Sequence, residues 1–201
     1  MKPLELYKDG EKVVCAFTLY IDPGAEEPDE MRRLILDGLG RIAGRYDTGQ
    51  GPVEVEVRVD ISDKFRFGAV NVRIIDETPV IRKRYSPRIN VSRAYYGARR
   101  RGLLKLGRFI LRKPDVYINL SGRDMQDQRQ RGVICSVIQH EFGHVLGFKD
   151  KYRMKSFRKK NEDVDDRDIM YRVGDAQKFM EYHIRRLKSC ADKGRIPFRN
   201  V

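Results

Sequence analysis

The sequence predicts an α+β fold with one twisted sheet, an edge strand, a long helix and a C-terminal helix. Two observations predict it. Apolar residues follow strand-like spacing in five segments and helical spacing in three others. The 201 residues suit one domain, and 40% hydrophobic residues are enough for its core. We expect a single domain over residues 1–201, with the sheet and long helix in 1–147 and a small C-terminal part in 148–201.

The chain begins with a buried strand, a helix and a half-buried strand. Residues 13–21 are almost entirely apolar, and Asp22-Pro23-Gly24 ends that strand. In residues 26–42, acidic residues suit the first turn of a helix, and apolar residues then recur at helical spacing. Residues 53–59 alternate valine with charged residues, which is the period of a strand with one buried face.

Three further strands are expected before the long helix. Residues 70–75 and 116–120 are rich in valine and isoleucine, as strands are. Residues 88–91 lie among basic residues, which discourage unwanted strand pairing, so we expect an edge strand there.

Two helices are expected in the last third of the chain. Apolar side chains recur on one face of residues 127–147, and Gly147 is typical of a residue that ends a helix. A polar loop follows, whose acidic part at residues 162–168 lacks the glycine and spacing of an EF-hand loop. We therefore expect no calcium there. Apolar residues at helical spacing then predict a final helix over residues 174–191.

The positive charge of the chain is concentrated in one segment. The net charge is +13, and twelve basic residues with no acidic residue lie between Thr78 and Pro114. Such a segment attracts phosphates, anionic lipids or acidic polypeptides without specifying which. Residues 82–113 are therefore a candidate surface for nucleic acid or another anionic partner. No apolar run is long enough for a transmembrane segment.

The sequence leaves the cellular compartment open. The start of the chain lacks a hydrophobic segment, so we expect no signal peptide. A cytoplasmic protein, one delivered by a signal-less route and an excised domain of a secreted protein all stay open. The three cysteines are too few and too scattered for a disulfide framework, and we expect free thiols in a monomer.

The long helix carries the informative motif, His140-Glu141-Phe142-Gly143-His144. Residues four apart lie on one face of a helix, so His140 and His144 can hold one metal ion through two imidazoles. Glu141 lies one residue round the helix, where its carboxylate can reach a water in the open position of the ion. This combination is the chemistry of peptide-bond hydrolysis by zinc.

A catalytic zinc ion usually takes three protein ligands. Asp150 is the favoured third ligand, because Gly147 can adopt the left-handed conformation that turns the chain back under the metal. Glu181 and His183 remain alternatives from a later helix.

The segment from His140 to Asp150 resembles the zinc signature of the metzincin clan of metallopeptidases. Most metzincins have a histidine where this chain has Asp150, and the aspartate variant is similar to the snapalysin family of small bacterial secreted proteases. The resemblance implies a zincin-like fold, whose twisted sheet is mixed and has an antiparallel edge strand. It also implies one catalytic Zn²⁺ and general-base catalysis by Glu141. It also implies that Tyr152 polarises the scissile carbonyl or stabilises the oxyanion, because a phenol can donate one hydrogen bond.

The resemblance implies two further features. Met170 would lie in the methionine-containing turn beneath the zinc histidines, as a soft apolar floor to the site. Substrate would pair with the edge strand by strand addition, so Arg88, Asn90 and Arg93 are candidate cleft residues beside an extended, acidic polypeptide.

The leading hypothesis is a zinc-dependent endopeptidase. One alternative is a nucleic-acid-associated basic protein with a zinc site, which the basic segment favours. Another is a delivered toxin or effector protease, which the absence of a signal peptide and an inhibitory prosegment would suit.

Overall fold

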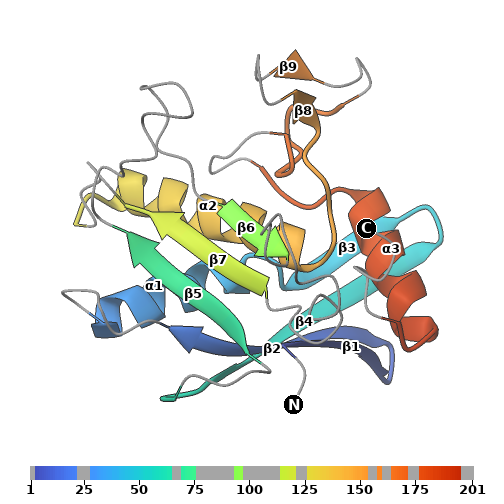
Figure 1. Ribbon diagram of the computed structural model, residues 1–201. Helices are drawn as coiled ribbons and strands as arrows, with labels where there is room; N and C mark the ends of the chain where they lie inside the picture. The colour runs from blue at the N-terminus through green and yellow to red at the C-terminus, as the bar shows by residue number, and fades with distance from the viewer. Residues whose placement is uncertain are drawn as a thin grey trace, which may run out of the picture.

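The computed structural model describes residues 3–21, 28–64, 69–75, 93–96, 114–120, 126–153, 158–159, 164–171 and 177–195. These residues form a curled mixed sheet and three helices, as Figure 1 shows. The α+β class expected from the sequence is confirmed. None of the described helices is both long and apolar enough to cross a bilayer.

The sheet has a parallel centre and antiparallel edges. Its strands are β1 (Leu4–Asp9), β2 (Lys12–Ile21), β3 (Gly44–Thr48), β4 (Gly51–Ile61), β5 (Val70–Ile75), β6 (Arg93–Tyr96) and β7 (Pro114–Asn119). The order is β3-β4-β2-β5-β7-β6, in which β4, β2, β5 and β7 are parallel. The edge strands β3 and β6 are antiparallel to their neighbours, and β1 is antiparallel to the first part of β2.

The core lies on the face of the sheet that the helices cover. The three helices are α1 (Pro28–Gly40), α2 (Gln128–Val145) and α3 (Glu181–Asp192). Alternate residues of β2 point into this layer, and Phe17 meets Phe142 of α2 edge-to-face with ring centroids 5.3 Å apart. Helices α1 and α2 lie side by side (Figure 1), and a Cβ on Gly38 would lie 2.7 Å from Ile138. The close approach of the two helices explains this glycine.

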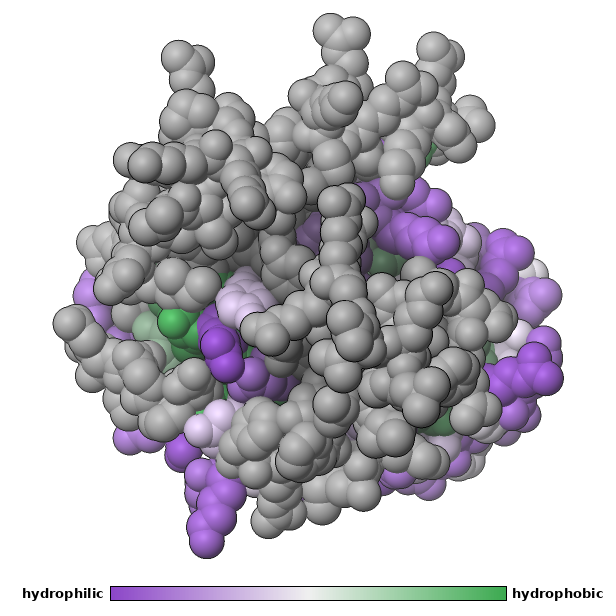
Figure 2. All heavy atoms as spheres, viewed as in Figure 1, coloured by the Kyte–Doolittle hydropathy of each residue, from purple (hydrophilic) through white to green (hydrophobic). Residues whose placement is uncertain are grey.

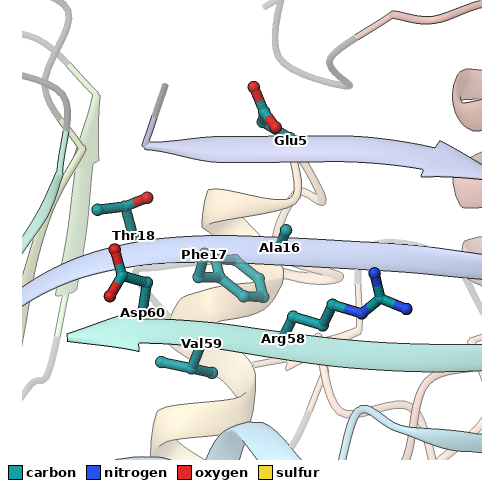
Figure 3. A pocket seen from close by; sticks show the side chains of 7 residues that line it. All are labelled: Glu5, Ala16, Phe17, Thr18, Arg58, Val59 and Asp60. Atoms are coloured by element: carbon teal, nitrogen blue, oxygen red, sulfur yellow. The ribbon is translucent and has the colours of Figure 1, made fainter. Parts of the chain in front are cut away.

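The other face of the sheet carries paired charges. Arg58 forms ion pairs with Asp9 and Glu56, at 2.7 and 2.6 Å. Beside Arg58, a shallow hollow of about 250 Å³ is lined by Glu5, Ala16, Phe17, Thr18, Arg58, Val59 and Asp60. Figure 3 shows its carboxylates on separate strands. The described surface near α3 is also hydrophilic in Figure 2.

Several predicted elements need correction. The strands β1 and β3 were not expected, and neither was the short hairpin of β8 (Tyr152–Arg153) with β9 (Arg158–Lys159). The predicted edge strand at 88–91 lies outside the described residues, and the described antiparallel edge strand on that side is β6.

The last helix begins at Glu181, later than the predicted 174. The backbone of Lys178 explains the difference. Its N–H donates to the carbonyl of Arg167 at 2.8 Å, and its carbonyl accepts from the N–H of Ile169 at 3.0 Å. These bonds hold Lys178 in a β-bridge with Asp168. Residue 178 therefore pairs with another segment and cannot continue a helix.

Candidate metal centre

Helix α2 places two histidines on one face. The side chain of Asp127 caps its first turn by accepting from the N–H of Arg129 at 2.8 Å. Buried apolar side chains anchor the opposite face in the core. His140 and His144, one turn apart, then lie with ring centroids 4.9 Å apart and ring planes at 87°.

The end of α2 directs the chain back towards these histidines. Gly147 has a φ of 83°, which is the left-handed conformation that glycine adopts most readily. The N–H of Gly147 donates to the carbonyl of His144 at 2.8 Å, and that of Phe148 donates to Gly143 at 2.9 Å. This pair of bonds is a Schellman motif, which ends a helix and reverses the chain. Asp150 follows the turn.

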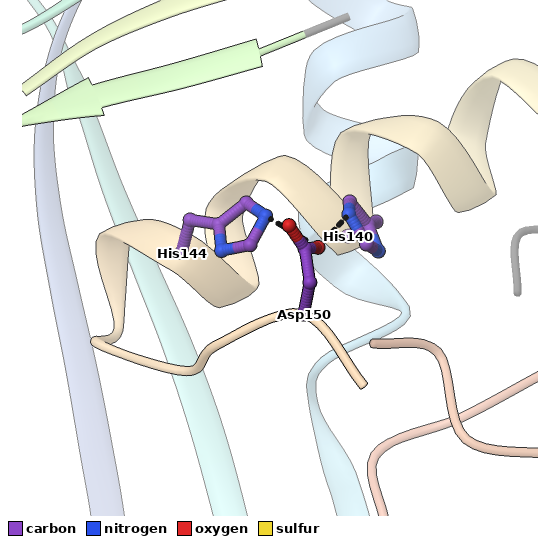
Figure 4. A group of neighbouring side chains, drawn as sticks. All are labelled: His140, His144 and Asp150. Atoms are coloured by element: carbon purple, nitrogen blue, oxygen red, sulfur yellow. Dashed lines mark ion pairs between the residues drawn. The ribbon is translucent and has the colours of Figure 1, made fainter. Parts of the chain in front are cut away.

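Asp150 meets both histidines, as Figure 4 shows. One oxygen, Oδ1, lies 3.3 Å from Nε2 of His140 and 3.2 Å from Nε2 of His144. The three ligand atoms all lie within 4.8 Å of one another. A tetrahedral zinc ion with bonds of about 2.0–2.1 Å holds its ligand atoms about 3.3–3.4 Å apart. The separations of 3.3 and 3.2 Å therefore fit a tetrahedral ion, and this cluster could bind a metal.

Hydrogen bonds on the far side of each ring set its orientation. Nδ1 of His140 donates to the carbonyl of Ile169 at 2.7 Å, and Nδ1 of His144 donates to the carbonyl of Phe148 at 2.9 Å. A carbonyl only accepts, so each Nδ1 carries the proton. In a neutral ring the lone pair is then on Nε2, which faces the cluster. Metal-binding histidines are commonly held in this way.

The electrostatics of the cluster favour positive charge between the rings and the carboxylate. Burial acts to lower the pKa of His144, but the hydrogen bond and charge of Asp150 outweigh it, so that pKa is raised. Burial acts to raise the pKa of Asp150, yet hydrogen bonds from His140 and His144, which Nε2 can donate only when the ring is protonated, hold that pKa well below its usual range. The carboxylate is therefore ionised at neutral pH and available as a ligand.

Glu141 is placed beside this cluster by the same helix. Its side chain is buried, with 4% of the residue exposed, and its charge contributes to the raised pKa of His144. Glu141 is therefore a buried carboxylate adjacent in sequence to the candidate ligand His140.

A tight turn at residues 168–171 lies beneath α2. The N–H of Tyr171 donates to the carbonyl of Asp168 at 2.9 Å, and the carbonyl of Met170 accepts from the N–H of Lys151 at 2.8 Å. Met170 is fully buried, and a Cβ on Gly143 would lie 2.6 Å from its sulfur. Gly143 lies between the two histidines in the sequence. Met170 therefore packs directly against the part of α2 that carries the candidate ligands.

The structure places the alternative third ligands elsewhere. The Glu181 carboxylate accepts from the N–H of Gly49 and from Arg185. His183 is buried among aromatic rings, and its Nδ1 accepts from the N–H of Met180 at 3.0 Å. Within the described residues, the group with metal-binding spacing is His140, His144 and Asp150.

Most of the other predicted site residues lie outside the described part of the chain, wholly or by their side chains. The backbone of Tyr152 lies in β8, two residues after Asp150, and its side chain is outside the described part of the chain. Arg88 and Asn90 also lie outside it, whereas Arg93 begins the edge strand β6. The three cysteines are free, and Cys15 is buried in β2; burial raises the pKa of its thiol to about 12, so it is a core residue.

Sequence reasoning missed the groups that hold the candidate ligands in place. The carbonyls of Ile169 and Phe148 are backbone atoms, so no side-chain pattern reveals them. The sequence predicts Asp168 as part of an acidic run and as the first residue of the methionine turn, but not as a group that supports a ligand. Its position two residues before Met170 is a recoverable signal, because aspartate often bonds the backbone N–H two residues on in a turn.

No protein-family model matches the chain, and no curated protein matches it.

Proposed function

We propose that this protein is a zinc-dependent endopeptidase. The observation that carries the proposal is the placement of one Asp150 oxygen at 3.3 and 3.2 Å from the Nε2 atoms of His140 and His144. Two imidazoles and one carboxylate form a ligand set used by catalytic zinc sites, which keep a fourth position open. Buried Glu141 beside that set favours hydrolysis over a structural role.

We also propose that the fold is of the metzincin kind, with a snapalysin-like aspartate as third ligand. Support comes from the order of the elements. Four parallel strands and the antiparallel edge strand β6 precede the histidine-bearing α2, and the Met170 turn and α3 follow it. The contact between Met170 and Gly143 agrees with a methionine turn beneath the histidines.

The side chains divide the chemistry between them. When bound, Zn²⁺ would polarise the scissile carbonyl and acidify a water molecule. Glu141 would remove the proton from the attacking water and pass it to the nitrogen of the leaving amine. His140, His144 and Asp150 would hold the ion, and Tyr152 would donate a hydrogen bond to the carbonyl oxygen as negative charge develops there.

The proposed substrate is an extended polypeptide that pairs with β6. This strand forms the described edge of the sheet next to β7, and it contacts α2. An edge strand offers unpaired backbone groups for strand addition. Since β6 lies within the basic segment of the sequence, acidic polypeptides would be preferred.

The test combines metal content with proteolysis. We expect about one zinc ion per chain and cleavage of denatured casein that chelation abolishes. Glu141→Gln should keep the zinc but lower the cleavage rate by roughly 10²–10⁴-fold, because general-base catalysis is lost. Glu181→Gln is the matched control, since Glu181 bonds Gly49 and Arg185 away from the cluster. Undiminished cleavage by Glu141→Gln, or no zinc in the wild type, would overturn the proposal.

A further inference from the structure

We propose that Asp168 and Tyr182 are positioning residues, which set the orientation of the metal-binding ring of His140 through the carbonyl of Ile169. The inference deepens the proposed function and rests on it only in one respect, namely that His140 binds a metal ion. It links the last helix of the chain to one ligand of the candidate metal centre.

The Asp168 carboxylate lies in a buried environment with donors from two segments. It is buried, with 1% of the residue exposed. One oxygen, Oδ1, accepts from the N–H of Met170 at 2.8 Å, and the other, Oδ2, accepts from the hydroxyl of Tyr182 in the first turn of α3. Nε2 of His183 lies 3.9 Å from Oδ1. A buried carboxylate is retained only where donors compensate for its desolvation, and here they come from two separate segments.

The bonds of Asp168 hold the backbone around Ile169. Asp168 and Met170 flank Ile169, so the bond from the Met170 N–H to the Asp168 carboxylate closes the backbone around Ile169. The N–H of Ile169 is bonded to Lys178, and its carbonyl receives the Nδ1 proton of His140 at 2.7 Å. The direction of that carbonyl therefore depends on the turn, and the turn is tied to α3 by Tyr182.

His144 is oriented by a different segment from the one that holds His140. Its Nδ1 donates to the carbonyl of Phe148, which belongs to the C-terminal turn of α2 itself. No atom of the 168–171 turn takes part in that bond. The two histidines are thus held by different segments, and loss of the Asp168–Tyr182 contact should disturb His140 while sparing His144.

Tyr182 has a second contact that a test must preserve. The ammonium nitrogen of Lys151 lies over the ring of Tyr182, 4.6 Å from the ring centroid. Lys151 follows the ligand Asp150 and donates its N–H to the Met170 carbonyl. Tyr182→Phe keeps a ring for Lys151 and removes only the hydroxyl bond to Asp168. This variant therefore isolates the hydroxyl.

Tyr46→Phe is the matched control. The hydroxyl of Tyr46 is also partly buried, and it donates to the carbonyl of Ile42 at 2.8 Å, in the segment between α1 and β3. Each substitution removes one tyrosine hydroxyl bond. Only the Tyr182 bond reaches the turn that holds His140.

The experiment uses the full chain labelled with ¹⁵N, both metal-free and loaded with zinc. Long-range ¹H–¹⁵N spectra report which nitrogen of each imidazole carries the proton, and competition with a chromophoric chelator measures zinc affinity. In Tyr182→Phe we expect a shifted tautomer balance for His140, an unchanged His144, and a roughly tenfold loss of zinc affinity. The zinc affinity of Asp168→Asn should fall between those of the wild type and Asp168→Ala, because the amide oxygen can still accept from the N–H of Met170.

Two results would overturn the inference. One is an equal change, or no change, at His140 and His144 in Tyr182→Phe. The other is a zinc affinity in Tyr182→Phe that matches that of Tyr46→Phe. Failure of the wild type to bind zinc would instead overturn the proposed function, while the metal-free spectra would still decide whether Tyr182 positions His140.

Discussion

Gly143→Ala tests the contact between α2 and the Met170 turn. The added Cβ would lie 2.6 Å from the Met170 sulfur and 3.2 Å from Cε1 of Phe179, where an ordinary carbon contact is about 3.5–4.0 Å. Both neighbours are buried, so they cannot swing into solvent. Overpacking of this kind costs about 1–3 kcal/mol, and the higher helix propensity of alanine offsets about 1 kcal/mol. We expect a net loss of about 1 kcal/mol.

Gly40→Ala is the matched control for this change. Gly40 ends α1, and a Cβ there would have no atom within 4 Å, so alanine should be neutral or stabilising by up to about 1 kcal/mol. The assay is urea unfolding of the full chain in a chelator, which removes the stabilisation that bound metal adds. A Met170→Ala background should make Gly143→Ala less harmful, because it frees the space that the Cβ needs. The reasoning would be refuted if Gly143→Ala were as stable as Gly40→Ala.

Two further predictions concern the end of α2 and His183. Gly147→Ala should lower the free energy of unfolding in urea by about 1–2 kcal/mol, because the φ of 83° is left-handed. Gly147→Asn should lower it less. Equal stability of the wild type and both variants would contradict this. Burial and the charges of Lys151 and Arg186 lower the pKa of His183 from 6.5 to about 3. Between these values His183 binds a proton in the unfolded chain but not in the native chain. The free energy of unfolding therefore falls as pH falls, by about 1.4 kcal/mol per pH unit. His183→Gln should remove this slope, and parallel stability curves for wild type and variant between pH 6 and 4 would contradict the assignment.

The central strands and two helices could be predicted because their patterns are local. Residues 13–21 and 53–59 show the apolar run and the alternation of strands, and both lie within observed strands. The strand β1 was missed although the sequence carries a signal for it, because Asp9-Gly10 is typical of a hairpin turn. In the structure Asp9 pairs with Lys12 across Gly10, whose φ is 59°. The start of α3 had none, because the bonds of Lys178 to Arg167 and Ile169 join distant segments.

In the candidate site, the ligands could be predicted from the sequence, but not all the groups that orient them could. The spacing of His140, His144 and Asp150 predicted their convergence, because a helix and a glycine turn determine it locally. The groups that orient them could not all be predicted. Phe148 is near in sequence, but the carbonyl that holds His140 is 29 residues away and depends on how the chain returns beneath α2.

The arrangement of the cluster is unfavourable without a cation. Both rings carry their Nδ1 protons towards carbonyl groups, so in the neutral state two Nε2 lone pairs would face the same ionised oxygen of Asp150. The lone pairs and the carboxylate charge repel one another unless a proton or a metal ion lies between them. The raised pKa of His144 is one response to this repulsion. A metal ion would satisfy both rings and the carboxylate together, so its binding should also stabilise the fold.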